Sequence, residues 1–133
     1  MRIVVIGSGY VGLVSGACFA DFGHDVACID KDADKIALLE AGRIPIYEPG
    51  LEDIVRSNRA AGRLVFDTDL ARHIGGAEVV VLAVGTPSRR GDGYADLSFV
   101  YQAAREVGEA ARGPLVVVTK STVPVGTGDE VER

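Results

Sequence analysis

Short runs of aliphatic residues recur along the chain and constrain its fold more than any other feature. Three of them occupy residues 3–6, 79–82 and 115–118. Runs this short are typical of strands that are buried on both faces, as in a parallel sheet covered by helices. Segments with helical spacing separate the runs, so the sequence predicts an α/β fold with a doubly wound parallel sheet and helices on both faces.

The expected elements alternate along the whole chain. Strands are expected at 2–6, 25–30, 64–66, 78–84 and 115–119, and helices at about 11–22, 33–41, 50–61, 69–74 and from 96 or 98 to 111. Asp32 is expected to cap the second helix, and Asp96 or Ser98 the long one after residue 95. The last residues read as the first turns of a further helix. We therefore expect residues 1–133 to be one domain from a longer protein.

Composition excludes several classes of function. Fourteen Lys and Arg against nineteen Asp and Glu give a net charge of −5, so no nucleic-acid partner is expected. No apolar stretch approaches the roughly 18 residues that span a bilayer, and Asp21 interrupts the N-terminal apolar segment. We expect a cytoplasmic protein with no membrane partner. Cys18 and Cys28 have no metal-site spacing and are predicted to be buried thiols in a reducing compartment.

A glycine pattern follows the first expected strand. Gly7, Gly9 and Gly12 form a G-x-G-x-x-G sequence that opens the first helix. Such glycines allow, in this order, a tight turn, the approach of a pyrophosphate to the backbone and close packing of the helix. The free amides of Tyr10, Val11 and Gly12 are then expected to face phosphate oxygens. The pattern predicts a dinucleotide site.

An acidic residue completes this pattern. Asp30 ends the second expected strand, where its carboxylate can accept hydrogen bonds from ribose hydroxyls. A carboxylate at this position also repels a 2′-phosphate, which favours NAD over NADP. Lys31 follows directly and could weaken that preference, although a solvated surface lysine is the simpler interpretation.

Two later strand ends carry polar groups that would lie beside the glycine loop. Gly85, Thr86 and Pro87 follow the fourth strand, and Lys120, Ser121 and Thr122 follow the fifth. Their hydroxyl and ammonium groups suit a ribose, a nicotinamide or a phosphate. The alternative is that they simply end the strands. Glu48, in the proline-rich loop at 43–51, is expected to be only a carboxylate at the start of a helix.

Taken together, these segments resemble the UDP-glucose/GDP-mannose dehydrogenase family over essentially the entire chain. The matching pieces are GSGYVG at 7–12, GHDV at 23–26, Asp30, Lys35, IPIYEPGL at 44–51, VGTPS at 84–88 and KSTVPVG at 120–126. IPIYEPGL and KSTVP are more specific than the glycine pattern. The segment at 120–126 is more similar to the UDP-glucose branch than to the GDP-mannose branch.

The resemblance implies a Rossmann-like NAD-binding domain from an enzyme that oxidises C6 of a sugar nucleotide twice with two NAD, here UDP-glucose to UDP-glucuronate. It implies NAD contacts at Val11, Asp30, Lys35, Thr86 and Thr122, and a sugar-nucleotide border at Lys120, Ser121 and Thr122. Thr122 would also support catalysis. The family's nucleophilic cysteine and its sugar-binding domains would lie beyond residue 133, so this chain alone is expected to be inactive. The full-length protein is expected to be a homo-oligomer without a metal.

Other functions stay open from the sequence. One is a different nucleotide-sugar 6-dehydrogenase, acting on GDP-mannose or a UDP-N-acetyl sugar. Another is a stand-alone regulatory module that senses NAD, and a third is a 3-hydroxyacyl-CoA or 6-phosphogluconate dehydrogenase. The sensing module shares the glycine pattern and the acidic residue but has no reason to carry IPIYEPGL or KSTVPVG. The other dehydrogenases are similar over roughly the first βαβ unit and diverge afterwards.

Overall fold

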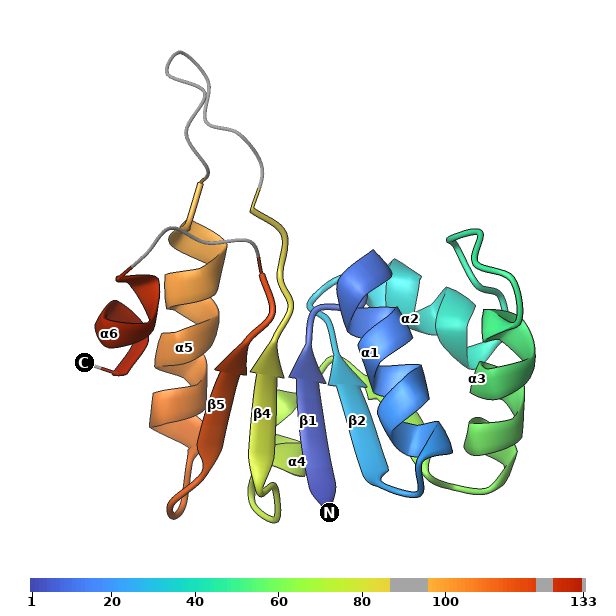
Figure 1. Ribbon diagram of the computed structural model, residues 1–133, viewed down its shortest axis with the longest axis horizontal. Coiled ribbons are helices and arrows are strands. Elements are labelled where there is room, and N and C mark those ends of the chain that lie inside the picture. Colours follow the sequence, from blue (N-terminus) through green and yellow to red (C-terminus); the bar gives the residue numbers. More distant parts are fainter. Residues whose placement is uncertain (87–95, 122–125, 133) are drawn as a thin grey trace.

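The computed structural model describes residues 1–86, 96–121 and 126–132. Within these residues five strands form one parallel sheet in the order β3-β2-β1-β4-β5 (Figure 1). The elements in chain order are β1 (Arg2–Ile6), α1 (Tyr10–Asp21), β2 (Asp25–Ile29), α2 (Ala33–Glu40), α3 (Leu51–Ala60), β3 (Leu64–Asp67), α4 (Leu70–Ile74), β4 (Val79–Leu82), α5 (Ser98–Ala110), β5 (Val116–Thr119) and α6 (Thr127–Glu132). The predicted doubly wound α/β fold is confirmed.

The strand order reverses direction beside β1. The chain runs outward from β1 to β2 and β3, then returns to pair β4 with the other side of β1. Ile6 is level with Ile29 of β2 and with Leu82 of β4, so the carboxyl ends of these three strands lie side by side. A sheet of this kind binds ligands at such a reversal, outside the carboxyl ends.

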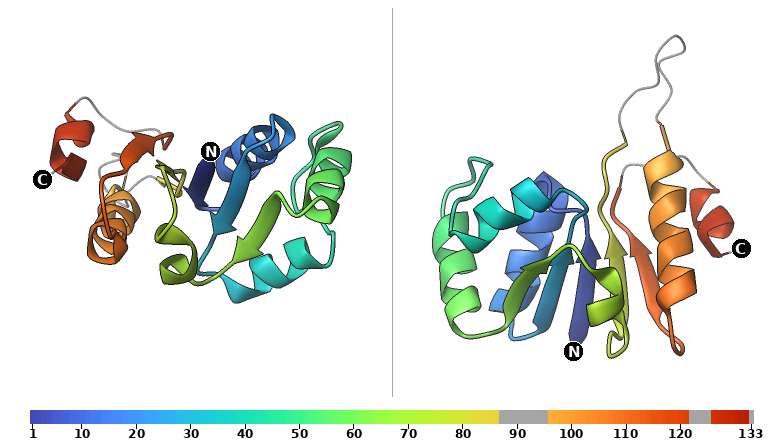
Figure 2. Two further views of the ribbon diagram at one scale, coloured as in Figure 1. Left: turned by 90° about the horizontal axis from the view of Figure 1, so that it is seen from below. Right: turned by 180° about the vertical axis from the view of Figure 1, so that it is seen from behind.

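Each face of the sheet has its own core. Successive strand residues point to opposite faces, so Val5 packs with α1, α2 and α3, while Val4 packs with α4 and α5. Figure 2 shows the sheet edge-on between the two layers. Val5 and Val80 are fully buried although they belong to different cores. This two-sided burial explains why the strands read as continuous apolar runs rather than as alternating ones.

The predicted element boundaries hold to within a few residues. Asp32 caps α2 through Oδ1, which accepts hydrogen bonds from the amides of Asp34 and Lys35. Asp96 accepts a hydrogen bond from the amide of Ser98 at 2.9 Å, but the residue at the N-cap position of α5 is Leu97. The fourth strand is shorter than the predicted 78–84 and ends at Leu82.

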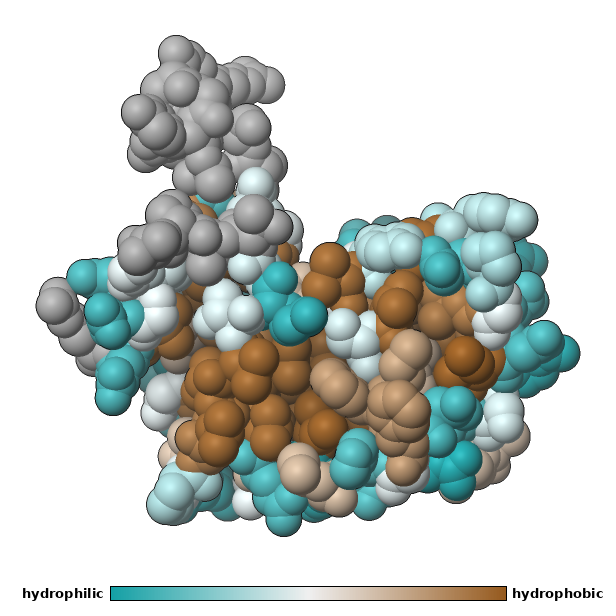
Figure 3. All heavy atoms as spheres, in the orientation of Figure 1, coloured by the Kyte–Doolittle hydropathy of each residue, from teal (hydrophilic) through white to brown (hydrophobic). Residues whose placement is uncertain are grey.

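The prediction that residues 115–118 are buried on both faces is wrong. β5 is the edge strand, and Val116 and Val118 keep 60% and 37% of their surface exposed. They pair with Val79 and Val81 of β4 and point to the same face as these residues. Helix α1 packs on this face, but over the strands nearer the centre of the sheet and not over β5. Figure 3 shows an apolar area where Figure 1 places β4 and β5. Local sequence predicts the strand, but only the tertiary neighbours decide its burial.

The two cysteines differ in environment. Cys28 is fully buried under α1, whereas Cys18 is only half-buried, so the prediction of two buried thiols is wrong for Cys18. Among the described residues, no helix is both long and apolar enough to cross a membrane.

Candidate functional site

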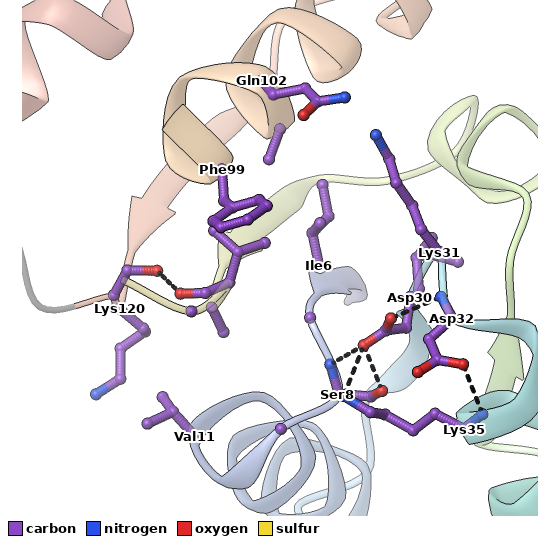
Figure 4. Close-up of a pocket in the computed structure, with 18 of the residues that line it drawn as sticks. Ile6, Ser8, Val11, Asp30, Lys31, Asp32, Lys35, Phe99, Gln102 and Lys120 are labelled. Carbon is purple, nitrogen blue, oxygen red and sulfur yellow. Dashed lines mark hydrogen bonds and ion pairs between the residues drawn. The ribbon is translucent and has the colours of Figure 1, made fainter. Parts of the chain in front are cut away.

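A cavity of about 1000 Å³ lies at the carboxyl ends of β1, β2 and β4 (Figure 4). This is the place that the strand reversal predicts. Ten of the residues singled out from the sequence line it: Gly7, Gly9, Tyr10, Val11, Asp30, Lys35, Gly85, Thr86, Lys120 and Ser121. Gly12 is not part of the lining. Pro87 and Thr122 lie outside the residues that the structure describes.

The glycines of the first loop have different steric surroundings. Gly7 has a φ of 104°, and a Cβ built on it would lie 2.5 Å from the carbonyl oxygen of Ala83. A Cβ on Gly12 would lie 1.8 Å from the carbonyl oxygen of Gly7, and one on Gly16 would lie 2.6 Å from Sγ of Cys28. These three positions are therefore restricted to glycine by the close packing of the turn, the helix and the sheet.

Gly9 is different, because no neighbouring atom among the described residues requires a glycine at this position. A Cβ built there would meet nothing within 4 Å, and the residue has a negative φ of −74° that any amino acid can adopt. The space that its missing side chain leaves belongs to the cavity. A glycine at this position makes sense if an external group approaches the backbone, and a pyrophosphate fits this requirement.

The N-terminus of α1 points into the same cavity. Gly9 is the N-cap residue, and within the described chain no side chain caps this end of the helix. The first-turn amides of a helix have no intrahelical acceptor and carry a partial positive charge. Tyr10 and Val11 of this turn line the cavity. The free end of this helix therefore lies at the cavity, where the sequence predicts that phosphate oxygens bind.

Asp30 is held in a fixed orientation at the opposite side of the loop. Its Oδ2 accepts hydrogen bonds from the amide of Ser8 at 3.0 Å and from the Ser8 hydroxyl at 2.7 Å. Its Oδ1 accepts one from the amide of Asp32 at 2.9 Å, and Nζ of Lys35 lies 3.7 Å from Oδ2. Figure 4 shows this cluster at one end of the pocket.

These contacts keep Asp30 ionised. Burial by itself raises the pKa of the carboxyl, but the three hydrogen bonds and the charge of Lys35 outweigh it and lower the pKa below its ordinary value. A carboxylate offers about four acceptor positions. Among the described residues a single donor bonds Oδ1, so this oxygen has the most capacity left for a hydroxyl donor from a ligand.

The other end of the cavity carries the residues after β4 and β5. Figure 4 places Lys120 and Val11 opposite the Asp30 cluster. The Ser121 hydroxyl donates to the carbonyl oxygen of Val84 at 2.7 Å, which ties the two strand ends together. The predicted ligand role of Ser121 therefore rests on the remaining acceptor capacity of its oxygen. Thr86 also lines the cavity.

Sequence reasoning missed the side of the cavity formed by α5. Phe99, Gln102 and Glu106 face it at a helical spacing of about one turn. Glu106 forms an ion pair with Nζ of Lys31, across 75 positions of sequence. Lys31 is 64% exposed, as expected for a surface lysine, but it is not simply solvated. The sequence feature that could have predicted this side is a second row of residues at helical spacing on α5, next to its apolar row.

The interpretation of Glu48 also needs correction. Its backbone carbonyl does accept from the amide of Leu51 at the start of α3. Its side chain, however, accepts a hydrogen bond from the Tyr10 hydroxyl at 2.5 Å and so joins the IPIYEPGL loop to α1. This hydrogen bond and the negative charge of Glu48 raise the pKa of Tyr10, which stays protonated at neutral pH.

Neither cysteine contributes to the cavity. Cys18 and Cys28 are absent from its described lining. Burial raises the pKa of the Cys28 thiol to about 12, so it carries almost no thiolate at neutral pH. The described residues thus bring anion-binding amides and an ionised carboxylate to one cavity, without a thiol nucleophile.

Comparison with known proteins identifies the family of this chain. All of residues 1–133 match the NAD binding domain of the UDP-glucose/GDP-mannose dehydrogenase family. The chain is 66% identical over 133 residues to a UDP-glucose 6-dehydrogenase of Rhizobium meliloti, an alignment that covers 100% of this chain and 30% of that protein. The chain thus spans less than a third of the length of this relative.

Solved structures give the same result. The GDP-mannose dehydrogenase of Pseudomonas aeruginosa superposes with a TM-score of 0.92 and 40% identity, over 98% of this chain and 30% of that one. A UDP-glucose dehydrogenase from Pyrobaculum islandicum gives 0.90 and 40%, over 98% and 32%. A stand-alone sensing module and the other dehydrogenase classes do not account for a match of this extent. The chain belongs to the UDP-glucose/GDP-mannose dehydrogenase family, in which it corresponds to the NAD-binding domain.

Proposed function

We propose that residues 1–133 are a single NAD-binding domain and hold the cofactor across the cavity between Asp30 and Lys120. The pyrophosphate lies at Gly9 and the N-terminal amides of α1, and a hydroxyl of the adenosine ribose donates a hydrogen bond to the carboxylate of Asp30. The observation that carries this placement is the empty space at Gly9, beside an uncapped helix end and an ionised carboxylate. Lys35 adds a positive charge next to the ribose.

The full-length protein is proposed to oxidise UDP-glucose at C6 to UDP-glucuronate with two NAD, the bound NAD accepting hydride. Identity of 66% to a UDP-glucose 6-dehydrogenase along the whole chain supports this substrate. Within residues 1–133, the described groups bind and orient the cofactor and do not attack the substrate. The buried thiol of Cys28, with its pKa near 12, agrees with a nucleophile that is supplied from elsewhere in the protein.

The loop after β5 is the part of this chain proposed to meet the sugar nucleotide. Lys120 lies at the side of the cavity away from Asp30, and the next residue, Ser121, also lines the cavity. A lysine there suits a phosphate or a developing negative charge on oxygen. Thr122, outside the described residues, is proposed to contact both NAD and substrate and to support catalysis by positioning.

The protein is further proposed to be cytoplasmic. Both cysteines are free, which agrees with a reducing compartment such as the cytoplasm. The full-length protein is proposed to be a homo-oligomer.

The activity test measures NADH formation by the full-length protein with UDP-glucose, GDP-mannose or UDP-N-acetylmannosamine as substrate. The proposal expects two NADH per UDP-glucose and slower turnover with the other two sugars. Residues 1–133 alone, tested in parallel, should form no NADH. Preferred turnover of GDP-mannose would replace the substrate assignment, and steady turnover by residues 1–133 would refute the division of roles.

A further inference from the structure

We infer that Glu106 determines how strongly this site prefers NAD over NADP, because it holds the ammonium group of Lys31 away from the adenosine ribose. The inference rests on the proposed function, since it assumes that the ribose lies at Asp30. It assigns a specificity role to a residue of α5, which lies outside the glycine loop and the β2 end.

Lys31 is placed where a 2′-phosphate would need a cation. It follows Asp30 directly, at the end of β2, and both residues line the cavity. Its ammonium group pairs with Oε1 of Glu106, and Nε2 of Gln102 lies 3.4 Å from the same oxygen. Figure 4 shows Lys31 extending away from the Asp30 carboxylate toward α5. The lysine is therefore next to the ribose in sequence but turned from it in space.

The other described cations of the lining are either paired with Asp30 already or distant from it. The described basic residues of the lining are Lys31, Lys35 and Lys120. Nζ of Lys35 lies 3.7 Å from Asp30 and already offsets its charge, and Lys120 lies at the opposite end of the pocket. Lys31 is thus the one described cation of the lining whose release would change the charge at the ribose.

The carboxylates of Asp30 and Glu106 then both favour NAD over NADP. A phosphate monoester carries a charge of about −1.5 to −2 at pH 7, so Asp30 repels it directly. Glu106 holds away the charge of Lys31, which could otherwise compensate the phosphate. The ion pair is partly solvated, with side chains 64% and 33% exposed, so its strength is modest. Its loss should tighten NADP binding about three- to five-fold and leave NAD binding nearly unchanged, because NAD has no 2′-phosphate.

The test is calorimetric titration of the protein with NAD and with NADP, for the wild type and four variants. Glu106→Gln frees Lys31 with little change of shape. Glu109→Gln is the matched control, because it removes the same charge from an exposed position of the same helix outside the cavity. Lys31→Met and the double variant show whether the lysine carries the effect. Thermal unfolding of each variant verifies that it is folded.

The inference expects a lower Kd for NADP in Glu106→Gln alone, with the NAD Kd changed less than two-fold. The gain should disappear in the Lys31→Met/Glu106→Gln double variant. An unchanged ratio of the two Kd values in Glu106→Gln overturns the inference, and so does a gain that persists without Lys31. A wild type that fails to bind NAD at all refutes the proposed function itself, so the two failures are distinguishable.

Discussion

Gly9→Ala should separate cofactor binding from folding. A Cβ at this position meets nothing within 4 Å, and the backbone φ of −74° suits alanine. The change should therefore alter the free energy of unfolding by less than about 1 kcal/mol, which includes the poorer N-cap propensity of alanine. The added methyl group occupies the space assigned to the pyrophosphate and pushes it from the helix amides.

The size of the binding effect follows from the bonds that would be lost. Each hydrogen bond to a charged group contributes about 1.5–3 kcal/mol, so losing one of them raises the Kd for NAD about ten- to a hundred-fold. Calorimetric titration measures the Kd, and thermal unfolding measures stability.

Gly12→Ala is the contrasting variant. Its Cβ would lie 1.8 Å from the carbonyl oxygen of Gly7, a backbone atom that cannot move aside. This variant should lose at least about 2–3 kcal/mol of stability. NAD binding by Gly9→Ala within two-fold of the wild type would refute the placement of the pyrophosphate. A large loss of stability in Gly9→Ala would show that the space beside Gly9 is not open.

Three further predictions concern stability and reactivity. Gly16→Ala should lower the free energy of unfolding by about 1–3 kcal/mol, because its Cβ would lie 2.6 Å from Sγ of Cys28. Cys28→Ala should relieve part of this loss. Chemical denaturation measures both effects, and strictly additive effects of the two changes would contradict the contact. The native Cys28 thiol, with a pKa near 12, should resist an alkylating reagent at pH 8 until the protein unfolds, and rapid native labelling would contradict its burial. The free energy of unfolding should fall as pH drops below about 4. The reason is that the pKa values of Asp30 and Asp67 are lowered in the folded state, so their contribution to stability is lost on protonation. Asp30→Asn and Asp67→Asn should flatten this dependence, and an unchanged pH profile in both variants would contradict it.

Local sequence predicted the elements of the site because each depends on neighbouring residues. The strand before Gly7, the helix after Gly9 and the acidic end of β2 are local features, and parallel strands bring their carboxyl ends together. The position of Asp30 beside the glycine loop follows from these facts alone. Its lowered pKa follows only in part, since it depends on the nearby amide of Asp32 but also on Ser8, which sequence reasoning treated as a spacer within the glycine pattern.

Contacts between distant segments were not predictable in the same way. The ion pair of Lys31 with Glu106 and the hydrogen bond of Tyr10 with Glu48 join residues 75 and 38 positions apart. Each needs the packing of a helix or loop against the sheet before its partners meet. The exposure of Val116 has the same origin, because an edge strand and a central strand have the same apolar composition. Burial is a property of the assembled sheet.

The location of bound NAD is the most direct test of the account. Protein-observed NMR, with assigned backbone amides, follows the described residues other than proline and Met1 during a titration with NAD. The account predicts saturable shifts at Gly9, Val11 and Asp30, and none at the hollow beside Arg56 and Arg59 on α3. Saturating NAD that leaves the amides of Gly9 and Asp30 unchanged, or that shifts the α3 hollow instead, would contradict the cofactor site.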